Sequence, residues 1–289
     1  MSLTNRLEDI RPIDPAEYVP FWVNGVQVGM MKPAFAACLA EFPEVFDVSN
    51  NTVKVSDHLS NHHARSHAVA RVLEILREQG LVPGWRGELY PVHHGGTAFE
   101  GKSFFDMERA ASTLFGIRTY GVNLHGYLRQ DDQLSLWIAR RSQSKETSPG
   151  KLDIVVGGGQ PSNISLKDNL IKECQEEAGI PGDLAKQAVF ASETKFCTER
   201  PEGIRNDIHY NYDLELPVNF TPKNTDGEVE DFYLWTVDKV MTILSDTDDF
   251  AFDSALAILD FLIRHGTIGT DHPDYQSLMN NFSGKDAHG

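Results

Sequence analysis

The segment from residue 157 to residue 180 constrains the fold of this chain more than any other. It reads GGGQPSNISLKDNLIKECQEEAGI, three glycines followed by an acidic stretch. Ser165 or Asp168 can cap a helix start, because the side-chain oxygen accepts from the first free backbone amides. Gly179 can end the helix, because glycine adopts the left-handed conformation without strain. The segment therefore predicts a glycine turn that leads into a helix of about three turns.

Three glutamates of this helix are expected to lie on one side of it. Glu173, Glu176 and Glu177 stand at positions i, i+3 and i+4, which are neighbours on a helix surface. Like charges at this spacing repel one another, so they require solvent or a cation. A divalent ion such as Mg²⁺ or Mn²⁺ suits clustered oxygen ligands. The alternative is a solvated acidic face, which is a common use of charge runs on helices.

The same segment resembles the Nudix box of nucleoside-diphosphate-linked hydrolases. It departs from that pattern at Ile164, where the family has a glutamate, and at Lys172, where the family has an arginine. In the family these two side chains pair and orient the metal-binding helix; because both are replaced here, no buried charge is left unpaired. The resemblance is carried by Gly158, Lys172, Glu173, Glu176, Glu177, Gly179 and Ile180.

The resemblance implies a metal-dependent site that hydrolyses a phosphoanhydride bond. Glu173 and Glu176 are the expected catalytic groups, with Lys172 orienting them as a point charge, and either glutamate could be the general base. The expected substrate-binding residues are Arg140, Gly158 and Gly159, and the expected metal ligands are Gly157, Glu173, Glu176, Glu177 and Glu230. Glu228 is the alternative to Glu230, and Arg140 could equally be an ordinary solvated residue.

A closer resemblance covers nearly the whole chain. The runs 149–177, 226–232 and 257–266 resemble Nudix proteins related to thiamine pyrophosphokinase, which carry an extra N-terminal domain. This implies thiamine diphosphate or its oxidised analogues as substrate, cleaved to the monophosphate and phosphate. One alternative is a module that binds metal or diphosphate without turnover. Another is an isopentenyl-diphosphate isomerase, which requires a cysteine before the box, and none lies between Cys38 and Cys174.

The chain as a whole predicts two α+β domains. Residues 1–116 are expected to form the smaller one, and residues 117–289 a Nudix α/β/α sandwich with a mixed sheet and a C-terminal helical extension. Apolar alternation and turn signals predict the elements: helices near 33–41, 56–79, 103–114, 237–244 and 253–264, and strands near 21–28, 88–92, 117–129, 134–140, 188–197, 207–216 and 232–236.

The composition limits the partners. The net charge of −16 argues against nucleic acid, which requires basic patches, so we expect a small-molecule diphosphate that arrives with metal or meets a local basic pocket. No apolar run approaches the length of a membrane span, so no membrane partner is expected. Three cysteines without CxxC spacing favour reduced thiols and a cytoplasmic location. A homodimer is left open.

Several chemically active residues are expected to be structural. The helix near 56–79 carries two histidine pairs with the i, i+4 spacing that can bind a transition metal, but no third ligand accompanies them, which favours a polar surface. His93 and His94 could line a pocket rim but are expected to be structural, and Cys174 is expected to pack in the core. The paired histidines are His58, His62, His63 and His67.

Overall fold

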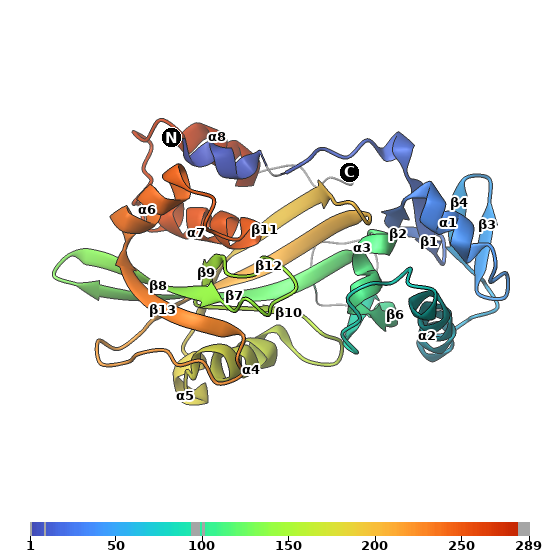
Figure 1. Ribbon diagram of the computed structural model, residues 1–289, viewed down its shortest axis with the longest axis horizontal. Coiled ribbons are helices and arrows are strands. Elements are labelled where there is room, and N and C mark those ends of the chain that lie inside the picture. Colours follow the sequence, from blue (N-terminus) through green and yellow to red (C-terminus); the bar gives the residue numbers. More distant parts are fainter. Residues whose placement is uncertain (1, 9, 94–98, 100–101, 283–289) are drawn as a thin grey trace.

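The structure is a computed structural model that describes residues 2–8, 10–93, 99 and 102–282. A long twisted sheet lies at the centre, with helices above and below it, and a smaller α+β part lies at one end of that sheet (Figure 1). This arrangement is the one the sequence predicts: a mixed sheet between helical layers, preceded by a smaller α+β region.

The N-terminal part contains a four-stranded sheet in the order β2-β1-β4-β3. Phe21 in that sheet and Phe115 pack edge to face, with ring centroids 5.1 Å apart, in the middle of an apolar core. The first elements are η1 (Leu3–Leu7), η2 (Pro15–Glu17), β1 (Val19–Val23), β2 (Val26–Met31), α1 (Pro33–Leu39), β3 (Phe46–Ser49), β4 (Thr52–Val55) and α2 (His62–Glu78). Then come β5 (Leu89–His93), β6 (Ser103–Glu108), η3 (Arg109–Ala111) and α3 (Ser112–Phe115).

Two sequence-based expectations for this part are wrong. The helix expected near 103–114 is instead β6, which pairs antiparallel with β5, followed by the short helices η3 and α3. Its apolar run, FFDM, is buried at every position, which suits a strand covered on both faces as well as a helix. The helix expected from residue 56 begins at His62, because Asn61 is the side chain that caps it, accepting from the amide of Ala64 at 2.9 Å.

The central sheet has seven strands, and its main path runs β11-β12-β7-β8-β13. β7 and β12 are parallel, whereas β10 pairs antiparallel with β7, so the sheet is mixed. The strands predicted by alternation are all present with slightly shifted ends. They are β7 (Arg118–Gln130), β8 (Gln133–Arg141), β11 (Val189–Glu199), β12 (Ile204–Glu215) and β13 (Val229–Thr236). The sequence does not predict β9 (Leu152–Ile154) or β10 (Val156–Gly159): residues 157–159, expected as a turn, belong to a strand that pairs with β7.

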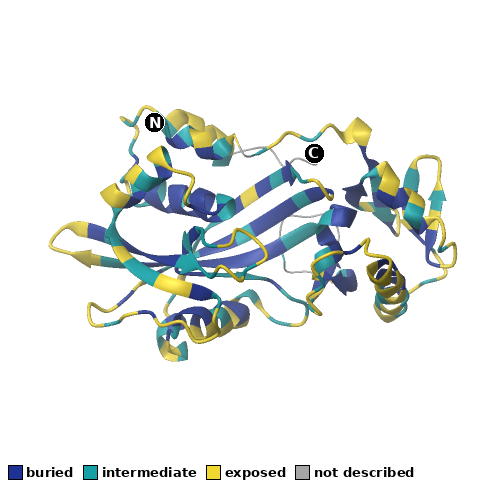
Figure 2. Cartoon of the chain, viewed as in Figure 1, coloured by how far each residue is buried: buried dark blue, intermediate teal, exposed yellow. Residues whose placement is uncertain are grey.

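Helices cover both faces of this sheet. α4 (Leu166–Ala178) and α5 (Gly182–Ala185) lie on one face, and α6 (Val237–Asp246), α7 (Phe252–Arg264) and α8 (Tyr275–Phe282) lie on the other (Figure 1). Each face has its own apolar core, and Figure 2 shows the buried strands between the two half-exposed helical layers. Cys174 lies in the α4 core and is fully buried, which confirms its expected structural place.

The first residues of the chain pack against its last helices. Leu3 is buried among α6, α7 and α8, and its amide donates to Asp274 Oδ2 at 2.8 Å. Arg6 Nε donates to the carbonyl of Leu244 at 3.0 Å. The sequence interpretation placed this segment in a separate N-terminal unit; in the structure the chain starts on the sandwich and then crosses to the smaller part (Figure 1).

Asp213 ties α7 to the sheet. Its carboxylate accepts from His125 Nδ1 at 3.1 Å and from Arg264 Nη1 at 2.5 Å, and it lies 2.9 Å from His265 Nε2. Burial opposes ionisation, but the hydrogen bonds from His125, His265 and Arg264 outweigh it and hold the pKa of Asp213 well below its usual value. The charged carboxylate therefore stabilises the contact between helix and sheet.

Replacing this carboxylate should weaken the fold in a pH-dependent way. Asp213→Asn should lower the free energy of unfolding by about 2 kcal/mol near neutral pH, since it removes one of the two carboxylates that pair with Arg264. A depressed pKa contributes stability only while the group is ionised, so the difference should shrink as the pH falls below about 4. Urea unfolding at several pH values measures this. Asp183→Asn, at a carboxylate that is 97% exposed, should leave the midpoint unchanged.

Candidate functional site

The acidic helix forms as its sequence predicts. Ser165 is the cap, because its Oγ accepts from the amide of Asp168 at 3.1 Å, and Gly179 ends α4 in the left-handed conformation at φ +61°. Its apolar side packs under the sheet through Leu170, Cys174 and Ala178. The opposite sides of the helix therefore carry its polar and acidic side chains.

Successive turns of α4 meet successive glycines of β10. Asn169 Nδ2 donates to the carbonyl of Gly159 at 2.9 Å, and the amide of Gly157 donates to Glu177 Oε2 at 2.9 Å. Between them, a Cβ on Gly158 would lie 2.5 Å from Glu173 Cδ. Positions 169, 173 and 177 are one helical turn apart and share one face, so this face lies directly on the glycine strand.

The two carboxylates on this face are withdrawn from water. Glu177 is 8% exposed, and burial raises its pKa well above the usual value. The charges of Glu173 and Asp153 raise this pKa further, whereas the hydrogen bond from the amide of Gly157 opposes the rise. Burial also raises the pKa of Glu173; Lys172 opposes this and the charges of Glu176 and Glu228 add to it. Two such neighbouring acids are stabilised by a cation or a proton.

Glu176 lies apart from this pair. Lys172 Nζ contacts Glu176 Oε2 at 2.6 Å and Glu173 Oε1 at 3.2 Å, and the Glu176 side chain is 49% exposed. The structure therefore brings Glu173 and Glu177 to the glycine strand, and Lys172 links Glu176 to Glu173. Within the described ranges, no group of three or more His, Cys, Asp or Glu side chains is gathered closely enough to hold a metal ion.

The donors nevertheless fit a hard divalent cation. Asn169 Oδ1 and Gln160 Oε1 are buried beside the glycine strand without a hydrogen-bond partner among the described residues. Buried acceptors left in this way call for a donor, a water or an ion. Together with the carboxylates of Glu173 and Glu177 they form an all-oxygen set, which is the chemistry that Mg²⁺ or Mn²⁺ prefers.

Glu228, immediately before β13, is a candidate for this site alongside Glu230 within the strand. The charge of Glu228 acts on Glu173, whereas Glu230 is exposed beside the irregularity between Val229 and Asp231. Burial would raise the pKa of Glu228, but its ion pair with Lys145 and the charges of Arg141 and Arg109 lower it. Glu228 is therefore an ionised carboxylate whose charge acts on Glu173.

The basic residues expected near the glycine turn have different surroundings. Arg140 Nη1 donates to the carbonyl of Gly150 at 2.8 Å, and its guanidinium lies 5.9 Å from the centre of the Tyr233 ring. Arg141 instead pairs with Asp153 at 2.7 Å, and Lys145 pairs with Glu228. The charges of Asp153, the partner of Arg141, and of Lys145 act on the buried Glu177, whereas Arg140 contacts Gly150 and Tyr233.

Two residues of the N-terminal part, Tyr90 and Arg109, lie against the glycine strand. No pattern in the sequence predicts either of them as a site residue. A Cβ on Gly159 would lie 1.6 Å from Tyr90 Oη and 3.3 Å from Arg109 Cζ. The guanidinium of Arg109 lies 5.3 Å from the centre of the Tyr90 ring. β5 is joined to the loop after β10, because the amide of Ser162 donates to the carbonyl of Leu89 at 2.8 Å.

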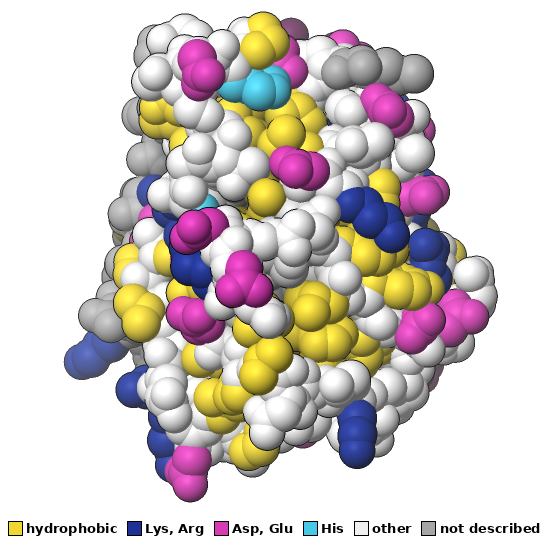
Figure 3. Space-filling model, turned by 90° about the vertical axis from the view of Figure 1, so that its left-hand side faces the viewer, with side chains coloured by type: hydrophobic (Ala, Val, Ile, Leu, Met, Phe, Trp, Pro, Cys, Tyr) yellow, Lys and Arg dark blue, Asp and Glu magenta, His cyan; other side chains and the backbone are white. Residues whose placement is uncertain are grey.

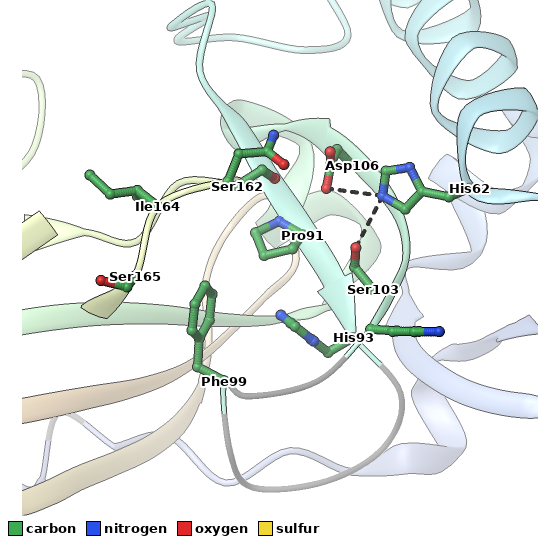
Figure 4. A pocket seen from close by; sticks show the side chains of 11 residues that line it. His62, Pro91, His93, Phe99, Ser103, Asp106, Ser162, Ile164 and Ser165 are labelled. Carbon is green, nitrogen blue, oxygen red and sulfur yellow. Dashed lines mark hydrogen bonds and ion pairs between the residues drawn. The ribbon is translucent and has the colours of Figure 1, made fainter. Parts of the chain in front are cut away.

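A pocket of about 460 Å³ opens at the same junction (Figure 4). His62 Nε2 lies 3.0 Å from Ser103 Oγ and 3.5 Å from Asp106 Oδ1 in the pocket wall, so one of the four paired histidines contacts polar groups there, whereas His58 lies before α2 begins. His93 also lines the pocket, whereas His94 lies outside the described residues. The lining is His62, Pro91, His93, Phe99, Lys102, Ser103, Asp106, Ser162, Asn163, Ile164 and Ser165.

The outer surface is mixed in chemistry. On the face shown in Figure 3, apolar side chains lie between scattered acidic and basic ones. This is the left side of Figure 1, where β13 forms the edge of the sheet and Leu234 is 39% exposed. In the part of the chain that is described, no helix is long and apolar enough to cross a membrane. The homodimer stays an open possibility, and the cytoplasmic location stays a prediction.

Comparison with known proteins identifies the family. Residues 3–119 match a family model described as Domain of unknown function (DUF4743), and residues 119–255 match the NUDIX domain. The chain is 40% identical over 279 residues to Nudix hydrolase 20, chloroplastic, of Arabidopsis thaliana, covering 93% of this chain and 74% of that protein. It is 40% identical over 264 residues to Nudix hydrolase 24, chloroplastic, of the same plant, covering 91% and 72%.

Among solved structures, the NUDIX domain of Shewanella oneidensis NrtR complexed with ADP ribose is similar at a TM-score of 0.42 and 16% identity, over 52% of this chain and 90% of that one. The assignment to a family rests on the two Arabidopsis thaliana relatives, which cover 93% and 91% of this chain. The chain belongs to the Nudix hydrolase family. It is accordingly a hydrolase with an N-terminal part of the DUF4743 type.

The buried acid on α4 should cost stability when no cation is bound. Glu177→Gln keeps an acceptor for the amide of Gly157 but removes the buried charge, so in chelator at neutral pH it should raise the free energy of unfolding by about 1 kcal/mol. Adding Mg²⁺ or Mn²⁺ should raise the melting temperature of the unchanged chain and not that of the variant. Equal metal-induced shifts in both proteins would remove Glu177 from the ligand set.

Proposed function

We propose that this protein is a metal-dependent hydrolase of small-molecule diphosphates, with thiamine diphosphate or its oxidised analogues as substrate. The observation that supports the reaction class is the register of α4 on the glycine strand, which holds Glu173 and Glu177 side by side in a water-poor site. The substrate is supported by the resemblance to Nudix proteins related to thiamine pyrophosphokinase.

The reaction would add water across one phosphoanhydride bond. Water attacks the terminal phosphorus, the bond to the bridging oxygen breaks, and phosphate leaves while the monophosphate remains. Bound Mg²⁺ or Mn²⁺ would neutralise the diphosphate and lower the pKa of a bound water. Glu173, Glu177 and the carbonyl of Gly157 would hold the cation, with Glu228 as a further ligand.

Other residues of α4 would manage the proton and the orientation. Glu173 or Glu176 would take the proton of the attacking water, since a general base must lie within reach of it. Lys172 contacts both side chains and would hold them as a point charge. Gly158 and Gly159 would present their backbone to the substrate beside Glu173 and Tyr90, which occupy the space that a side chain on either glycine would fill.

A module that binds diphosphate without turnover is the second candidate. One observation favours it: Lys172 is paired with Glu173 and Glu176, and Ile164 stands in the pocket wall where the family has a glutamate. An isopentenyl-diphosphate isomerase is not supported, because it would require a reactive cysteine. Burial raises the pKa of the Cys174 thiol to about 12, which leaves it unreactive.

A phosphate-release assay separates the two candidates. Thiamine diphosphate, its oxidised analogues and ADP-linked compounds are supplied with Mg²⁺ or Mn²⁺, and we expect turnover by the unchanged chain. Glu173→Gln should lower kcat by about 10²-fold or more, as removal of a metal ligand or general base does. Glu74→Gln, at an exposed glutamate of α2, is the control.

Glu228, just before β13, and Glu230, within it, give a finer comparison. Glu228→Gln should lower activity by about tenfold or more, because its charge acts on Glu173. Glu230→Gln should have little effect, because its side chain is exposed. The reverse order would restore Glu230 as the ligand. Tight binding of every diphosphate without phosphate release would favour the non-catalytic module.

A further inference from the structure

We infer that Arg109, held on the ring of Tyr90, is the group through which the N-terminal part binds the terminal phosphate of the substrate. The inference rests on the proposed function and adds to it a residue outside the NUDIX match. It predicts that the catalytic site of this protein is completed by its N-terminal part, at the end of the glycine strand.

The position of Tyr90 is fixed by the glycine strand itself. Its hydroxyl lies where a Cβ of residue 159 would be, at 1.6 Å from the ideal atom, so only glycine admits this approach. The backbone bond from Ser162 to Leu89 holds the two segments together at 2.8 Å. Gly159 is the neighbour of Gly158, against which Glu173 packs. Tyr90 therefore stands one residue along the strand from the buried acids.

Arg109 is held beside that ring but keeps donors for a ligand. Its guanidinium lies 5.3 Å from the ring centre, and Nη1 donates to Glu88 Oε2 at 2.9 Å. The backbone amide of Arg109 also donates to the carbonyl of Glu88 at 2.8 Å, so both ends of the residue are fixed. A guanidinium has five N–H donors, and this side chain is 43% exposed, so donors remain for a phosphate.

The negative charge of the chain requires a positively charged group to bind the phosphate. A chain with a net charge of −16 repels a diphosphate unless a local positive charge receives it. Arg109 pairs with Glu88 of the N-terminal part, whereas the other basic groups near the buried acids pair with carboxylates of the sandwich: Lys172 with Glu173 and Glu176, Lys145 with Glu228, and Arg141 with Asp153. An arginine can grip phosphate with two parallel hydrogen bonds, which a lysine cannot.

The test uses the full chain and a probe that cannot be hydrolysed. Methylenediphosphonate is titrated with Mg²⁺ present, and its dissociation constant is measured by calorimetry. Arg109→Ala should weaken binding by about tenfold or more, and Arg109→Lys should recover only part of it, because the charge returns without the fork. With a hydrolysed substrate, Arg109→Ala should raise KM more than it lowers kcat, a split that a loss of packing alone would not produce.

Arg77→Ala is the matched control. Arg77 also lies over an aromatic ring of the N-terminal part, 4.7 Å from the centre of Trp85, so the control removes the same kind of contact elsewhere. It should leave binding unchanged, and melting temperatures should show that all variants are folded. Equal binding by Arg109→Ala and the unchanged chain would overturn this inference alone. If the unchanged chain neither binds the probe nor hydrolyses any diphosphate, the proposed function fails as well.

Discussion

The contact between one helix face and one strand of glycines determines how this protein is built. α4 can lie on β10 in this register because Gly158 has no side chain where Glu173 packs, and Asn169 and Glu177 hydrogen-bond to Gly159 and Gly157 on either side of it. Two carboxylates are thereby forced out of water and next to each other, which costs stability in the folded protein. The apolar side of the same helix, packed under the sheet, compensates for that cost.

Much of this follows from the sequence because the relevant patterns are local. Helix caps, the spacing of acids on α4 and the alternation along β7, β8, β11 and β12 depend on neighbouring residues, and the structure confirms these elements. β6 is mistaken for a helix because a short run that is buried at almost every position has no period that separates the two states. Its pairing with β5 decided the matter, and a pairing partner is not visible in a single segment.

The candidate site, like the fold, can be predicted from the sequence only in part. The sequence places Glu173 and Glu177 on a helix beside glycines, but the choice between Glu228 and Glu230 depends on an irregularity in β13 that only the sheet pairing reveals. Tyr90 and Arg109 lie roughly 50–70 residues before the glycine strand, and their approach results from how the two parts pack. Likewise, Ile164 could be recognised as a departure from the family pattern, but its place in a pocket wall could not.

The packing of η1 on α6, α7 and α8 affects how the chain can acquire its structure. The bond between Leu3 and Asp274 joins residues 271 positions apart, so it cannot form until almost all of the polypeptide has left the ribosome. The smaller part can gather its own core well before then, because its strands and helices lie within the first 120 residues. The sandwich can therefore close around η1 only after α8 has been synthesised.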